Sequence, residues 1–300
     1  MTTTTTPIAP SPDRPTEPSP SRTDRAVGRG RSHGVLLHVA LIAGLILMIG
    51  PFVWMILGSF KTTGELRRLP PTFLPSDPTF GNYRELFDRL DFPRFLFNST
   101  VVAVAVTAGN LLFCSMLGYA LAKLEFPGKR VLLVLMLGTM MIPAFVTFMP
   151  LFVLVSNMNL NNTHAGLILP FVAGAFGAFL MRQFISGLPD ELLDAARVDG
   201  AGEYTIFFRI VLPLCGPALA TLGILTFLTQ WNSFLWPLVV ASTEDMYTLP
   251  VALALFSIGQ QESNVALQMA GSVVVILPVV VLFFALQRYV IQGVATSGLK

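Results

Sequence analysis

The sequence predicts an all-α integral membrane protein with six transmembrane helices and both termini in the cytoplasm. Apolar residues make up 53% of its 300 residues and charged residues 12%, which is about half the usual charged fraction of a globular protein. The mean hydropathy is +0.69. A soluble protein of this size could not cover its surface with so few charges. The composition therefore supports a protein embedded in a membrane.

Five long stretches contain no Asp, Glu, Lys or Arg: 34–60, 95–122, 131–181, 210–243 and 263–287. A spanning helix needs about 20 mostly apolar residues, so the third stretch is long enough for two helices. The polar segment 156–164 separates them. The predicted spans lie near 35–58, 96–121, 131–155, 165–185, 213–240 and 268–290. They should be helical because unpaired backbone groups in lipid are costly, and the short alternating segments typical of a β-barrel are absent from the sequence.

The N-terminal segment, residues 1–33, differs in composition from the rest of the chain. It is rich in Thr, Pro, Ser and Arg, and such a segment cannot bury a core. This composition predicts a disordered cytoplasmic tail before a transmembrane domain of residues 34–300. The tail and the first span together could pass for a signal peptide. An uncleaved anchor is the preferred interpretation, because the apolar run is long and no small-residue cleavage site follows it.

The fifth predicted span carries both prolines and polar side chains. Pro217 and Pro237 are expected to kink it or to leave part of it re-entrant. Gln230, Trp231 and Asn232 lie within it, and two interpretations of them are open. They could line a pathway for a sugar, with hydrogen-bonding groups and an aromatic face. They could instead bond neighbouring helices and belong to an aromatic belt, and composition alone favours this second interpretation.

The distribution of Lys and Arg predicts the orientation, because these residues accumulate on the cytoplasmic side. With the N-terminus inside, thirteen of them lie inside and six outside. The inner set is Arg14, Arg22, Arg25, Arg29, Arg31, Lys123, Lys129, Arg130, Arg182, Arg197, Arg209, Arg288 and Lys300. All six outer ones lie in the first outer loop, residues 61–94, together with five acids. This loop opposes the rule, and its near-balanced charges and its prolines indicate an ordered cap that contacts a protein partner.

Several functional classes are excluded by what the sequence lacks. The predicted spans hold essentially no charged residues, which argues against a proton- or sodium-coupled carrier. Neither a zinc-protease motif nor a phosphate-binding loop occurs. Two cysteines and three histidines leave little for metal or acid–base chemistry, and a net charge of +2 gives no reason to expect a nucleic-acid partner. We expect no catalytic residue, no metal and no cofactor. If the protein works against a gradient, the energy must therefore come from a partner.

The most informative segment is the predicted cytoplasmic loop 187–213. Pro189 suits the first position of a helix, and Asp190 and Glu191 suit the positive end of its dipole. Leu192, Ala195, Ala196 and Asp199 then share one face, where the small alanines would let a protein partner approach closely. Gly200 and Gly202 end this helix. A second short helix follows from Glu203 with Phe207, Ile210 and Val211 on one side, and Pro213 opens the fifth span.

The spacing in this loop resembles the EAA loop of ABC importer permeases, the inner membrane components of binding-protein-dependent transport systems. The matching residues are Asp194-Ala195-Ala196, then Gly200, then Ile210, Leu212 and Pro213. Segments 188–192, 231–238, 59–62, 82–83 and 287–300 resemble the second permease of maltose-type (CUT1) carbohydrate importers. The resemblance covers residues 35–300. Asp194 stands where the family usually has Glu. The tail ends in Gly298-Leu299-Lys300 rather than Gly-x-Lys-Gly, so the family's tail contact with the ATPases is not implied.

The resemblance implies a type I ABC permease fold and one of two permease subunits, forming a heterodimer in the bacterial cell membrane. Two cytoplasmic ATP-binding subunits and an extracytoplasmic solute-binding protein would be its other partners. The solute would be a sugar or oligosaccharide. A polyol or glycerol phosphate is the nearest alternative, and a membrane enzyme or scaffold subunit is the rival from another class. The residues implied to couple the loop to an ATPase subunit are Glu191, Asp194, Ala195, Ala196, Asp199, Gly200 and Pro213.

Overall fold

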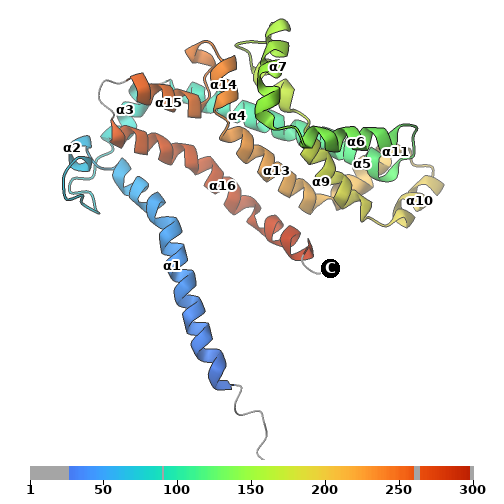
Figure 1. Cartoon of the computed structure of the whole chain (residues 1–300), viewed down its shortest axis with the longest axis horizontal. Helices are drawn as coiled ribbons and strands as arrows, with labels where there is room; N and C mark the ends of the chain where they lie inside the picture. The colour runs from blue at the N-terminus through green and yellow to red at the C-terminus, as the bar shows by residue number, and fades with distance from the viewer. Residues whose placement is uncertain (1–26, 90, 260–263, 298–300) are drawn as a thin grey trace, which may run out of the picture. The chain divides into compact units, whose positions relative to one another are not determined.

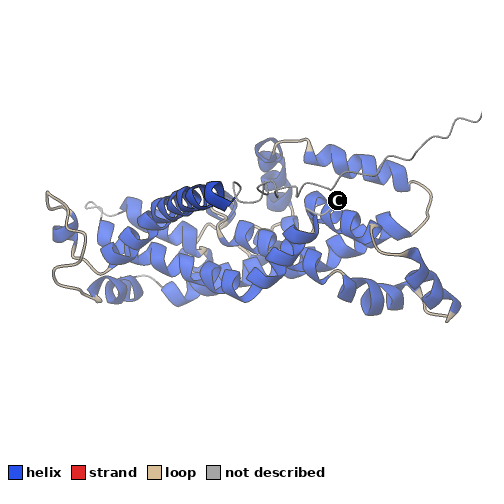
Figure 2. Cartoon of the chain, turned by 90° about the horizontal axis from the view of Figure 1, so that it is seen from below, coloured by secondary structure: helices blue, strands red, loops and turns tan. Residues whose placement is uncertain are grey.

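A computed structural model describes residues 27–89, 91–259 and 264–297 of the chain. Over these residues it consists of helices joined by loops and turns, without a strand, as the sequence predicts (Figures 1 and 2). The chain divides into two units, residues 1–53 and 54–300. The first includes most of α1 (Val27–Ser59), and the second holds the remaining helices.

The helices of the second unit alternate between long apolar segments and short connecting ones. They are α2 (Thr63–Leu66), α3 (Gly81–Arg89), α4 (Phe92–Gly109), α5 (Ser115–Lys123), α6 (Lys129–Met140), α7 (Ala144–Asn157), α8 (His164–Ile168), α9 (Ala175–Ser186), α10 (Asp190–Val198), α11 (Glu203–Ile206), α12 (Leu212–Leu214), α13 (Gly216–Trp231), α14 (Leu235–Val240), α15 (Leu249–Gly259) and α16 (Val265–Ser297). Two π-helical turns, Asn110–Cys114 and Phe207–Val211, join α4 to α5 and α11 to α12.

Two of the described helices are long and apolar enough to cross a membrane without a break: Leu37–Ser59 and Phe92–Lys123. Three bent pairs raise the number to five if each pair is one span: α6 with α7, the segment His164–Phe171 with α9, and Glu203–Leu214 with α13. The segment Val265–Val281 of α16 is a further apolar helix. Six spans with cytoplasmic termini therefore stay a prediction.

The third predicted span, 131–155, is not one continuous helix; the fourth, 165–185, is bent by 42° before α9; and the fifth, 213–240, is interrupted as its prolines predict. The third is bent by 104° between α6 and α7, where Pro143 precedes α7. Proline lacks an N–H group and pushes the preceding residue out of the helical region. The fifth is bent by 80° before Gly216 and ends at Trp231, with α14 following from Leu235. Both breaks lie shortly before the prolines that were expected to interrupt this span. Pro213, expected to open it, lies in α12 before the bend.

The predicted boundary at residues 33 and 34 is also too late. Helix α1 begins at Val27, because extending an existing helix backwards adds one hydrogen bond for each residue without a new nucleation cost. Residues 1–26 of the predicted disordered tail and residues 298–300 of the C-terminal tail lie outside the described residues.

The π-helical turn Asn110–Cys114 is bonded to the break between α8 and α9. Asn110 Nδ2 donates to the carbonyl oxygen of Phe171 at 2.6 Å, where the chain leaves its helical path before α9. The amide of Gly174 donates to Cys114 Sγ at 3.4 Å, and that thiol donates to Asn110 Oδ1 at 3.3 Å. Two helix discontinuities thus satisfy each other's polar groups, as a low-dielectric environment requires.

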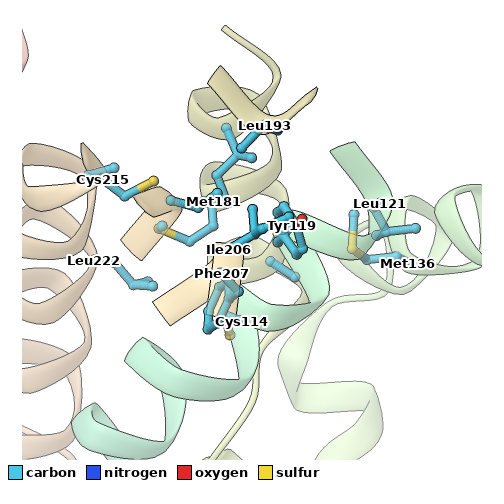
Figure 3. Packing of buried hydrophobic residues seen from close by; sticks show 14 of the residues in the cluster. Cys114, Tyr119, Leu121, Met136, Met181, Leu193, Ile206, Phe207, Cys215 and Leu222 are labelled. Carbon is cyan, nitrogen blue, oxygen red and sulfur yellow. The ribbon is translucent and has the colours of Figure 1, made fainter. Parts of the chain in front are cut away.

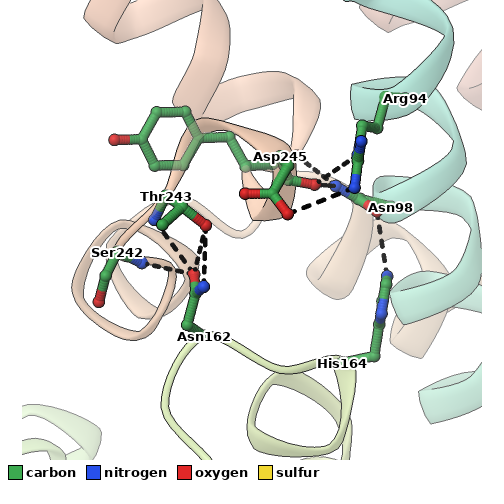
Figure 4. Close-up of polar contacts among 8 residues, drawn as sticks. Arg94, Asn98, Asn162, His164, Ser242, Thr243 and Asp245 are labelled. Atoms are coloured by element: carbon green, nitrogen blue, oxygen red, sulfur yellow. Dashed lines mark hydrogen bonds and ion pairs between the residues drawn. The ribbon is translucent and has the colours of Figure 1, made fainter.

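The segments that the sequence places outside converge on one polar cluster (Figure 4). Buried Asn98 donates to the carbonyls of Asp245 and Tyr247 at 2.9 and 3.0 Å. Its Oδ1 therefore faces His164, whose Nε2 is the donor at 3.0 Å. Asn162 accepts from the amides of Ser242 and Thr243 at 2.9 and 3.1 Å. Helix α4, the turn before α8 and the loop after α14 are thereby held together.

The first outer loop is ordered by buried polar groups over residues 61–89, which we call the outer cap. Lys61 is 2% exposed and donates to the carbonyl and the hydroxyl of Thr72. Buried Glu65 accepts from the Thr72 hydroxyl at 2.7 Å and from the amide of Ser76 at 2.9 Å. Asn82 donates to the carbonyl of Lys61 at 2.8 Å. These contacts explain how a loop so rich in charge and proline adopts one shape.

Candidate functional site

The candidate coupling loop is supported by the inner core, a cluster of buried apolar side chains from α5, α9, α10, α11, the turn Phe207–Val211 and α13 (Figure 3). Leu193 enters it from α10, Ile206 and Phe207 enter from the second short helix, and Met181 enters from α9. The loop 187–213 is therefore packed against the helices on which it lies, and its position depends on theirs.

Helix α10 ends where the sequence predicts and begins one residue later than predicted, with Pro189 just before its first residue. Asp190 and Glu191 lie in its first turn, and Arg197 lies in its last, all in favourable positions relative to the helix dipole. Gly200 follows with a φ of +82°. The amide of Gly200 bonds the carbonyl of Arg197, and the amide of Ala201 bonds that of Ala196 at 2.9 Å. This pair of bonds is a Schellman motif, which requires the left-handed conformation that glycine adopts without steric cost.

The outward face of α10 differs from the predicted one. Ala196, expected beside Ala195 on the partner-facing side, is only 9% exposed and packs into the inner core with Leu193. The exposed residues of α10 include Glu191, Leu192, Asp194, Ala195 and Val198, with Asp199 after them. Val198 is 88% exposed, and Tyr204 of α11 is 75% exposed.

In the second half of the loop, from Glu203 onward, the apolar residues that the sequence places on one side do lie on one side. Phe207 and Val211 are buried and Ile210 is half-buried, all on the side that faces the inner core. Pro213 is exposed and lies in α12, before the bend that precedes α13.

Charged side chains tie the end of α10 to α11. Arg197 donates to Asp194 at 2.8 Å and to Glu203 at 2.9 Å, and the hydroxyl of Tyr119 on α5 donates to the same Glu203 carboxylate. The hydrogen bond to Glu203 raises the pKa of the Arg197 guanidinium above its ordinary value. Asp194 is thus already paired within the chain, although its side chain is 66% exposed and open to a second contact.

The start of α10 is held by Lys123, the last residue of α5. Its Nζ donates to the carbonyl of Leu188 and to the carboxylate of Asp190, both at 2.6 Å. This role of Lys123 and Tyr119 was not predicted from the sequence. The signal that could have revealed them is their spacing of four residues at the cytoplasmic end of a predicted span, which puts both side chains on one helix face.

The three candidate pathway residues do not form one polar surface. Trp231 is buried, stacks on Phe227 with ring centroids 5.6 Å apart, and donates through Nε1 to the carbonyl of Val275 at 3.0 Å. Trp231 therefore links α13 to α16, which agrees with the interpretation that these side chains bond neighbouring helices. Asn232 is exposed and bonds the carbonyl of Leu228 within its own helix end. Gln230 is half-exposed.

Comparisons with a family model, with individual proteins and with solved structures all match permeases or transporters of solute-import systems. A family model described as "binding-protein-dependent transport system inner membrane component" matches residues 115–296. An arabinooligosaccharides transport system permease protein of Halalkalibacterium halodurans is 41% identical over 88% of this chain and 96% of its own length. A sn-glycerol-3-phosphate transport system permease protein of Yersinia enterocolitica is 32% identical over 89% of this chain and 98% of its own. A solved structure of a bacterial ABC transporter involved in the import of the acidic polysaccharide alginate includes a chain that matches with a TM-score of 0.78 and 25% identity, over 91% of this chain and all of that one.

Proposed function

The chain belongs to the family of inner membrane components of binding-protein-dependent transport systems, and we propose that the solute it admits is an oligosaccharide. It is a permease subunit of an ABC importer and not an enzyme. The relative at 41% identity belongs to a system for arabinooligosaccharides, and this similarity is the observation that carries the proposed solute.

A second permease completes the pathway in this proposal, and two ATPase subunits bind from the cytoplasm, one of them at the loop 187–213. The exposed residues Glu191, Asp194, Ala195, Asp199 and Gly200 would contact an ATPase subunit. Exposed Leu192, Val198 and Tyr204 support this assignment, because an apolar helix face in a groove is a recurring mode of helix recognition. Ala196 would act from beneath by seating α10 on the inner core. Pro213 would shape the exit from the loop, and Gln230 is the remaining candidate for the pathway.

The proposed orientation in the bacterial cell membrane has both termini inside and the solute-binding protein outside. The two ends of one helix support it. Asn98 of α4 joins the predicted outer segments and Tyr119 of α5 joins the predicted inner ones. Their 21-residue separation corresponds to about 32 Å along a helix, close to the roughly 30 Å of a bilayer's hydrocarbon core. Reporter fusions at residues 75, 160 and 255 should read outside and those at 126 and 200 inside, and an inside signal at 75 would contradict this topology.

The solute is tested with the assembled importer. The chain is purified with its second permease, its ATPase subunits and its binding protein in lipid nanodiscs. ATP hydrolysis is then measured with the binding protein loaded with an arabinooligosaccharide, with sn-glycerol 3-phosphate, or with neither. Stimulation by the oligosaccharide alone supports the proposal. Stimulation by sn-glycerol 3-phosphate alone would assign the other solute class.

A further inference from the structure

Both ends of the coupling helix α10 are attached to one helix, α5, to which they have no direct chain connection. At the start of α10, the Lys123 ammonium bonds the carbonyl of Leu188 and the carboxylate of Asp190, both at 2.6 Å. The Lys123 side chain is only 6% exposed. A lysine buried to this extent has given up most of its hydration, so these two acceptors replace hydrogen bonds that water would otherwise provide.

At the end of α10, the attachment to α5 is indirect and passes through the carboxylate of Glu203 on α11. Arg197 of the last turn donates to Glu203 at 2.9 Å, and the hydroxyl of Tyr119 donates to that same carboxylate. Tyr119 and Lys123 lie four residues apart on α5, so they form one row along the helix. This row holds α10 at two points and resists both sliding and rotation of α10 against α5.

The chain connections of α10 are short loops: residues 187–189 lead into it from α9, and residues 199–202, which include the Schellman motif at Gly200, lead on to α11. Helix α5 in turn is packed closely on α9. A Cβ at Gly118 would lie 2.8 Å from the backbone nitrogen of Arg182. A displacement of α5 would therefore reach α9 directly.

We propose that α5 carries the movement of the coupling helix into the membrane, with Lys123 and Tyr119 as the positioning residues that join them. This inference rests on the proposed function of the loop. An ATPase subunit that moves α10 would move α5 with it, and α5 continues through the turn Asn110–Cys114 into α4, which reaches the outer polar cluster. Neither residue needs to touch an ATPase subunit or the solute.

The test is Lys123→Met in the assembled importer in nanodiscs. The measured quantity is the ratio of ATP hydrolysis with the arabinooligosaccharide-loaded binding protein to hydrolysis without it. We expect this ratio to fall at least about fivefold, the lower end of typical allosteric coupling factors. The matched control is Lys129→Met. Lys129 also donates to one carbonyl and one carboxylate, of Leu124 and Glu125 at 2.8 and 2.9 Å, but both partners lie in its own loop, and the ratio should stay at the wild-type value.

Two further variants separate positioning from simple stabilisation. Lys123→Arg keeps the charge and two or more donors and should restore the ratio. Tyr119→Phe removes a single hydroxyl and should lower the ratio in a complex that still assembles. A wild-type ratio in assembled Lys123→Met or Tyr119→Phe would overturn the inference, even if the yield of complex fell. An unstimulated wild-type complex would instead contradict the proposed function, so the two failures are distinguishable.

Discussion

Replacing Gly118 with Ala should separate two helices that touch through their backbones. Gly118 lies in the middle of α5, and a Cβ placed there would be 2.8 Å from the backbone nitrogen of Arg182 and 2.8 Å from Cβ of Met181. Ordinary van der Waals contacts of a Cβ begin at 3.4 Å. The methyl group therefore requires a shift of about 0.6 Å between α5 and α9, because backbone atoms cannot turn aside as a flexible side chain can.

Inserting one methyl group into a packed interface costs about 1–3 kcal/mol. An Ala residue also stabilises a helix by up to about 1 kcal/mol relative to Gly, so the cost of the clash must be measured against a Gly→Ala substitution that causes no clash. Gly138 provides the control, since it lies within α6, is exposed, and a Cβ there would meet nothing within 4 Å. The difference between the two variants isolates the clash. For a chain of this size it corresponds to a melting temperature roughly 2–12 °C lower for Gly118→Ala, at about 2–4 °C for each kcal/mol.

The measurement is the fraction of each detergent-purified variant that remains monodisperse after heating, followed by size-exclusion chromatography. Gly118→Ala should melt below Gly138→Ala. If the two variants melt together, or if Gly118→Ala melts higher, the backbone contact between α5 and α9 does not exist as described. The argument that α5 passes displacement directly to α9 would then lose its basis.

Three further predictions concern the outer cluster, the outer cap and the coupling loop. Asn98→Ala removes three hydrogen bonds and should cost about 3 kcal/mol of unfolding free energy at about 1 kcal/mol each, whereas exposed Thr100→Ala should cost little; equal melting curves would refute this. The hydrogen bond from Thr72 lowers the pKa of Glu65 below its ordinary 4.5, so its stabilising effect is complete above pH 4.5 and is lost as the pH falls toward the lowered pKa. Proteolysis of the cap should accelerate in that acidic range, and Glu65→Gln should abolish the pH dependence. Gly200→Val and Asp194→Lys should each abolish uptake while leaving the protein in the membrane, as uptake assays and membrane fractionation would report; normal uptake in Asp194→Lys would remove that residue from the coupling surface.

The sequence predicted the helical class and, to within one residue, the ends of α10, because these depend on local chemistry. Runs without charge require helices in lipid, and Pro189 and Gly200 restrict the backbone wherever they occur. The bends before Pro143 and Gly216 could not be read from hydropathy, because a kink changes the direction of a helix without changing how apolar it is.

The inward direction of Ala196 and the roles of Tyr119 and Lys123 depend on contacts between distant parts of the chain. Ala195 and Ala196 are chemically identical, and only packing against the inner core distinguishes them. Lys123 meets Asp190 across 67 residues of sequence. A single sequence without relatives gives no pairing information over that distance, and the positive charge of Lys123 could be assigned only to a side of the membrane.

The paired discontinuities at Asn110 and Gly174 also limit how this protein can change over generations. Exchange of Asn110 for an apolar residue would remove the donor that satisfies the carbonyl of Phe171, and a bare carbonyl in a buried place costs about 1–3 kcal/mol. Straightening the break before Gly174 alone would leave the Asn110 amide with only the carbonyl of Val106 as its acceptor. A substitution at either position therefore changes the hydrogen bonding of the other.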